Sequence, residues 1–116
     1  MKPERIVLAT MGLLLAVAGV VRADEPPPDG AKLYQLNCQL CHGREGKALP
    51  VYAKKGAPDL NDPEFQKART DEDLRNVISE GSAGTVMKAF KKTLSPEKID
   101  ALVKHIRTLA PPAPAK

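Results

Sequence analysis

The run "NCQLCHG", residues 37–43, contains both cysteines of the 116-residue chain. Cys38 and Cys41 are three residues apart, and His42 follows directly. Residues three apart on a helix lie on the same face, so the two thiols would point in one direction with the imidazole beside them. Both thiol groups of the chain therefore lie at one place, next to a histidine.

The first 23 residues predict an export signal. A basic start, "MKPER", precedes the apolar run of residues 6–21, and Val21 and Ala23 occupy the small-residue positions of a cleavage site. The run is shorter than the roughly 20 residues that span a bilayer, so we expect a membrane anchor only if the signal is not cleaved. The expected organisation is a cleaved signal peptide at 1–23, a proline-rich tether at 24–29, a domain at 30–110 and a disordered tail at 111–116, exported to the periplasm.

The domain has little apolar material with which to build a core. The chain has no tryptophan, two tyrosines and two phenylalanines. A domain of this size often needs a disulfide, a metal or a cofactor to complete its core. The formal net charge of +4 comes partly from the leader, and no basic block occurs, so we expect no nucleic-acid partner.

The pattern of the domain is helical. Leu33, Leu36 and Leu40 share one face of a helix that begins at Gly30, behind the N-cap Asp29. No segment alternates with period two, and residues 43–61 and 82–94 predict loops, so the fold class is all-α. Three further helices are expected: a short one from Pro63 capped by Asp62, one after the capping box of Thr70 and Asp73 that ends at Gly81, and one from Pro96 capped by Ser95.

Three chemistries use closely spaced thiols: a redox disulfide, a zinc site and thioether attachment of a haem. A redox pair belongs at a helix start after a strand, whereas these cysteines end a helix. Zinc needs a second pair of ligands, and His105 is the one further histidine. A structural disulfide across three residues would constrain little. Cys-x-x-Cys-His is typical of haem attachment, with Cys38 and Cys41 bonded to the vinyl groups and His42 as an iron ligand.

A six-coordinate haem requires a second axial ligand. Met87 is the one methionine after the leader, and it falls in an irregular, lysine-flanked loop rather than on an apolar helix face. We therefore prefer it as a ligand over the alternative of core filler. His105 is the rival ligand, but its place at the edge of the last helix favours a packing role.

Residues 29–110 resemble the class I cytochromes c of bacterial type. The resemblance rests on Gly30, Tyr34, "CQLCHG", "APDL" (57–60), "TVMKAF" (85–90) and "ALVKHIRTL" (101–109), in that order. It implies about four helices wrapped around one covalently bound haem c. It also implies that the Pro58 carbonyl accepts a hydrogen bond from His42, and that Gly30 lets the first helix cross closely over the last at His105. Lys88 stands where many members have proline, which would leave the methionine loop less rigid.

These patterns predict a periplasmic monohaem protein that shuttles single electrons between redox partners and is not itself an enzyme. Two alternatives stay open: a haem c subunit of a periplasmic dehydrogenase or oxidase complex, and a ligand-binding or peroxidatic haem protein. Basic side chains are expected to dock an acidic face of the partner. They are Lys88, Lys91, Lys92, Arg44 and Lys47.

Overall fold

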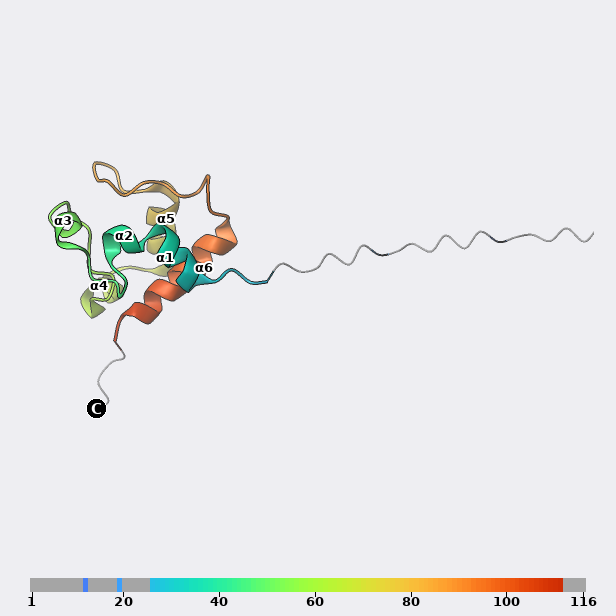
Figure 1. The fold of residues 1–116 in the computed structure, drawn as a ribbon, viewed down its shortest axis with the longest axis horizontal. Coiled ribbons are helices and arrows are strands. Elements are labelled where there is room, and N and C mark those ends of the chain that lie inside the picture. The colour runs from blue at the N-terminus through green and yellow to red at the C-terminus, as the bar shows by residue number, and fades with distance from the viewer. Residues whose placement is uncertain (1–11, 13–18, 20–25, 112–116) are drawn as a thin grey trace, which may run out of the picture.

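The computed structural model describes residues 12, 19 and 26–111, and within them it contains helices and no strand (Figure 1). The expected all-α class is confirmed, and four of the helices have six residues or more. The predicted signal peptide and most of the tail lie outside the described residues. The helices are α1 (Gly30–Asn37), α2 (Gln39–His42), α3 (Pro50–Ala53), α4 (Pro63–Ala68), α5 (Asp71–Glu80) and α6 (Pro96–Leu109).

Side-chain caps start the four longer helices where the sequence predicts them. The carboxylate of Asp29 accepts a hydrogen bond from the Lys32 backbone N–H, and Asp62 and Ser95 cap α4 and α6 in the same way. In α5 the Thr70 hydroxyl and the Asp73 carboxylate each accept from the other residue's N–H, which completes the predicted capping box.

Two predictions about helix and loop boundaries were wrong. The first helix, predicted to carry Leu33, Leu36 and Leu40 on one face, ends at Asn37, and Leu40 lies in the separate helix α2, with Cys38 capping both helices. The stretch 43–61 is not all loop either, because Pro50 at a first helical position starts the single turn of α3. The many glycine and proline residues around that turn concealed it in the sequence.

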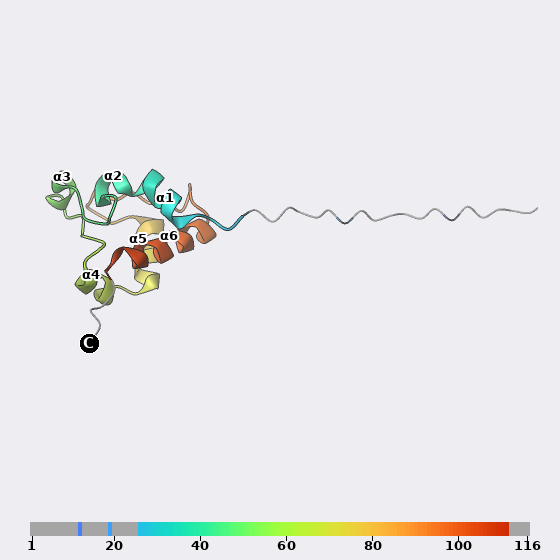
Figure 2. The ribbon, with the colours of Figure 1, turned by 60° about the horizontal axis from the view of Figure 1, so that its bottom comes forward.

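The core lies where α6 crosses α1 and α5 (Figures 1 and 2). Leu102 and Val103 of α6 are fully enclosed, together with Tyr34 of α1. This apolar stripe of α6 holds the domain together because it meets both of the other long helices. The buried cluster consists of Tyr34, Cys38, Leu60, Leu74, Ile78, Phe90, Leu94, Ile99, Leu102, Val103 and Ile106.

The crossing of α1 over α6 depends on the absence of a side chain at Gly30. A Cβ atom there would lie 2.2 Å from the carbonyl oxygen of Ala101 and 3.1 Å from Cβ of His105. The close crossing inferred from the resemblance is thus confirmed. Beside it, the rings of Tyr34 and His105 pack with their centroids 5.1 Å apart.

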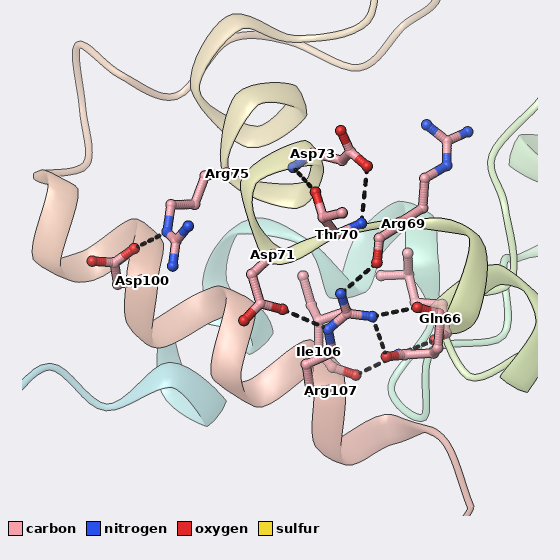
Figure 3. A network of polar contacts seen from close by, with 10 residues as sticks. Gln66, Arg69, Thr70, Asp71, Asp73, Arg75, Asp100, Ile106 and Arg107 are labelled. Atoms are coloured by element: carbon pink, nitrogen blue, oxygen red, sulfur yellow. Dashed lines mark hydrogen bonds and ion pairs between the residues drawn. The ribbon is translucent and has the colours of Figure 1, made fainter.

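A polar network holds the junction between α4 and α5 against α6 (Figure 3). The Arg107 guanidinium donates to Asp71 Oδ1 at 2.8 Å and to the backbone oxygens of Gln66 and Arg69. The Gln66 amide donates in turn to the carbonyls of Leu60 and Ile106, at 2.7 and 2.8 Å. Charge-assisted bonds of this kind are stronger than neutral ones, so the network fixes a segment that has little apolar packing of its own.

Within the described part of the chain, no helix combines the length and the apolar character needed to cross a membrane.

Replacing Gly30 by Ala should lower the free energy of unfolding by about 2 kcal/mol, because the new Cβ meets backbone atoms of α6 that cannot rotate away. Denaturant unfolding of the purified protein, followed by far-UV circular dichroism, measures the change. Gln35→Ala, an exposed position of the same helix, is the control and should shift stability by less than about 0.5 kcal/mol. Equal stability of the Gly30 variant and the wild type would contradict the close crossing.

Candidate haem site

One cavity of about 480 Å³ brings together the segments that the sequence singled out. Its walls come from the cysteine motif, the loop around Pro58, helices α4 and α5, and the loop that carries Met87. Most of the lining side chains are apolar, and the volume lies in the range of small-molecule and cofactor sites. Leu36 and Leu40, which are 71% and 73% exposed, face this cavity rather than the protein core.

His42 lines the cavity with one ring nitrogen enclosed by protein. Its Nδ1 is buried and has no hydrogen-bond partner, which leaves Nε2 as the nitrogen open to a ligand. Burial lowers the pKa of His42, so the neutral ring with its free lone pair is favoured. The Pro58 carbonyl lies close enough to raise that pKa in part, but it does not form a hydrogen bond of regular geometry with Nδ1.

The two cysteines lie beside His42 in the cavity wall, and neither is in a disulfide. Burial, with a smaller effect of the nearby Cys41, raises the pKa of the free Cys38 thiol to about 11. A redox-active pair needs a lowered thiol pKa, so this environment disfavours the redox alternative. Among the residues that the structure describes, no group of three or more His, Cys, Asp or Glu side chains is arranged to hold a metal ion.

Met87 lines the same cavity from another part of the chain, 45 residues after His42. Its side chain is half-buried and packs at the edge of the core. His105, the rival ligand, lies elsewhere: it contacts Tyr34 and lines a surface groove between α1 and α6. The structure thus brings Met87 together with the cysteine motif and places His105 at the helix crossing.

The residues expected to dock a partner are dispersed. Lys88 lines the cavity, whereas Lys91 forms an ion pair with Glu80 at 2.8 Å. The cavity lining does not include Arg44, Lys47 or Lys92, although all three side chains are exposed.

Three cations in the cavity wall lie over aromatic rings, and two of them, Lys55 and Arg69, were not expected from the sequence. Lys55 lies over Tyr52, Arg69 over Phe65 and Lys88 over Phe90, with 5.2 to 5.8 Å between the charged group and the ring centroid. We call Lys55, Arg69 and Lys88 the cationic rim. None of the three takes part in the ion pairs seen among the described residues. In the sequence, each of these cations lies only two to four residues from its aromatic partner, and this short spacing could have revealed the pairs.

Solved structures include a c-type cytochrome and part of a dehydrogenase that have a similar architecture. The structure of the KustC0563 c-type cytochrome matches with a TM-score of 0.67 and 36% identity, covering 72% of this chain and 99% of that one. The dihydro-heme d1 dehydrogenase NirN, in complex with DHE, matches with a TM-score of 0.56 and 32% identity over 75% of this chain and 17% of that one.

Curated relatives are subunits of an oxidase. The Cbb3-type cytochrome c oxidase subunit FixP of Bradyrhizobium sp. (strain ORS 278) is 35% identical over 80 residues, which are 69% of this chain and 26% of the relative. The subunit FixP of Azorhizobium caulinodans is 30% identical over 95 residues, 81% of this chain and 31% of the relative. The chain thus spans between a quarter and a third of the length of these relatives.

Residues 25–106 match the family model described as "Cytochrome C oxidase, cbb3-type, subunit III", and the chain belongs to this family of c-type cytochromes. The expected cofactor is confirmed, because membership of the family implies covalently bound haem c. The residues present fit it: the cavity is mostly apolar, the two cysteines stand in its wall, and an imidazole nitrogen and a thioether sulfur are available as ligands.

Proposed function

We propose that the domain transfers single electrons through a haem c held by Cys38, Cys41, His42 and Met87. The observation that carries this proposal is that the cysteine motif and Met87 line one apolar cavity, although 45 residues separate the two ligands. Bound haem supplies an iron that takes up and releases one electron. Two strong protein ligands leave no coordination position for a substrate, which favours electron transfer over the ligand-binding and peroxidatic alternative.

The residues of the site have separate roles in this proposal. Cys38 and Cys41 would form the thioether bonds and Nε2 of His42 would bind the iron, with the Pro58 carbonyl near enough to His42 to help orient its ring. The thioether of Met87 would be the second iron ligand, and a methionine ligand would raise the reduction potential relative to a second histidine. Val77, Ile78 and Ile106 exclude water from the cavity, which lowers the local dielectric and acts in the same direction.

Substitution of Met87 by Ala in the holoprotein should abolish the ferric charge-transfer absorption that is typical of a methionine-to-iron bond. Exogenous imidazole should then bind without competition from the protein. Val86→Ala, the neighbouring loop residue, is the control and should retain the band. Retention of the band in the Met87 variant would exclude this methionine as the ligand.

The relatives favour an oxidase subunit over a freely diffusing shuttle. Both FixP proteins are named as subunits of a cbb3-type cytochrome c oxidase, which agrees with the alternative function predicted from the sequence. We propose that the domain passes electrons within such a complex, on its periplasmic side, and that reduction of oxygen takes place in other subunits. The shuttle keeps one specific support, since the matched KustC0563 cytochrome is a separate chain covered at 99%.

Purification of the full chain through a C-terminal tag from detergent-solubilised membranes of its own cells should recover oxygen-consuming oxidase activity. The Cys38→Ala, Cys41→Ala double variant, which cannot attach haem, should recover less of it. Elution of the chain alone, with haem bound and without oxidase activity, would refute the subunit proposal and leave the shuttle.

We also propose that the cationic rim attracts the partner to the cavity mouth, and that Lys91, Lys92, Arg44 and Lys47, which do not line the cavity, contribute less. Lys55, Arg69 and Lys88 are exposed residues that line the proposed haem cavity, and each cation lies over an aromatic ring. Asp73 is the acidic residue of the lining, and hydrogen bonds from Thr70 lower its pKa, so it stays ionised at neutral pH. The mouth therefore has a positive excess, which speeds encounter with an anionic surface.

Oxidation of the reduced protein by the anionic hexacyanoferrate(III) should slow about threefold or more when the ionic strength rises from about 0.01 M to about 0.15 M. Neutralising the rim by Lys55→Gln and Arg69→Gln should flatten this dependence, because fewer positive charges remain to be screened. Lys98→Gln, an exposed lysine of α6 outside the cavity lining, is the matched control. If stopped-flow rates of the rim variant and the control fall equally with salt, the rim does not steer.

A further inference from the structure

The loop that carries Met87 is closed on itself by backbone hydrogen bonds. The N–H of Ser82 donates to the carbonyl of Met87 at 3.1 Å, and the N–H of Thr85 donates to the carbonyl of Ser82 at 3.1 Å. After the loop, the N–H of Phe90 returns to the carbonyl of Ile78 in α5 at 2.9 Å. The ends of the loop are therefore fixed to each other and to the end of a helix.

The Thr85 hydroxyl supplies the link inside this loop. It donates to the Ser82 carbonyl at 2.7 Å and accepts from the N–H of Met87 at 3.1 Å. Both backbone polar groups of Met87 are consequently engaged, its carbonyl by Ser82 and its N–H by the side chain of Thr85. Among the described hydrogen bonds, the hydroxyl is the one acceptor for that N–H.

Gly81 lies close against the backbone of Met87. It has φ +78, and a Cβ atom there would lie 2.8 Å from the Met87 carbonyl oxygen and 3.0 Å from the Ala89 nitrogen. A side chain is therefore excluded both by the backbone conformation and by the close approach of the chain. The Met87 backbone is thus approached closely by Gly81 and bonded by the hydroxyl of Thr85, a residue that also lines the cavity.

We propose that Thr85 is a positioning residue for the axial methionine: its hydroxyl holds the backbone of Met87 so that the sulfur stays directed at the iron. The inference rests on the proposed ligation by Met87 and adds what retains that ligand. Lys88 occupies the position of the proline expected from the resemblance, so in this chain the hydrogen bonds of Thr85 and Ser82 to the Met87 backbone supply the restraint that a proline would otherwise give.

The test is competition by imidazole in the ferric holoprotein. Thr85→Val removes the hydroxyl but keeps the branched shape, so the population with Met87 dissociated should rise. Loss of one such hydrogen bond should tighten apparent imidazole binding by about three- to tenfold, because imidazole binds the form without the methionine bond. Thr85→Ser restores the hydroxyl and should return the affinity to within about twofold of the wild type.

The control is Thr108→Val, which removes another exposed threonine hydroxyl bonded to a backbone carbonyl, that of His105, in α6. Equal imidazole affinity in Thr85→Val and the wild type, with the methionine charge-transfer band present in both, would overturn the role of Thr85 alone. An equal gain in Thr108→Val would overturn it too, by showing general destabilisation. Absence of the band from the wild type would refute ligation by Met87, and the inference with it.

Discussion

The contact of Gly30 with the backbone of Ala101 is the constraint on which the rest of the domain depends. Because Gly30 has no side chain, the backbones of α1 and α6 come into contact, and the apolar stripe of α6 packs against both α1 and α5. The same crossing places Tyr34 in the core, where its hydroxyl donates to the carbonyl of Gly43 at 2.7 Å. The turn after the cysteine motif is therefore attached to the helix crossing, and the position of His42 follows from it.

Interactions between neighbours in the chain made the helices predictable. Asp29, Asp62 and Ser95 cap helices within three residues of themselves, and such local chemistry can be read from sequence. The cysteine motif and Met87 were identified because the chain has only two cysteines, and only one methionine after the predicted leader. These local signals identify the helix caps and the candidate haem ligands, but they do not show which contacts hold the ligands in place.

Contacts between distant residues could not be predicted from the pattern. Arg107 forms hydrogen bonds with Gln66 and Asp71, which precede it by 41 and 36 residues, and no periodic pattern in the sequence predicts these contacts. The surroundings of the charged residues were hidden for the same reason: Lys91 is paired with Glu80, eleven residues away, while Arg69 lines the cavity and takes part in no ion pair among the described residues. Charge can be counted in a sequence, but whether a charge is available depends on the fold.

The residues that lead into α1 lie on a different surface of the domain from the mouth of the haem cavity. Pro27 and Pro28 lead into α1 along a groove on the outer face of α6, which they share with Lys104 and His105. That groove and the haem cavity have no lining residue in common, and both views show the chain entering at the α1 and α6 end, away from α3 (Figures 1 and 2). An attachment through residues 26–28 therefore leaves the cationic rim accessible, and the domain can be held beside a partner without covering the edge through which an electron would pass.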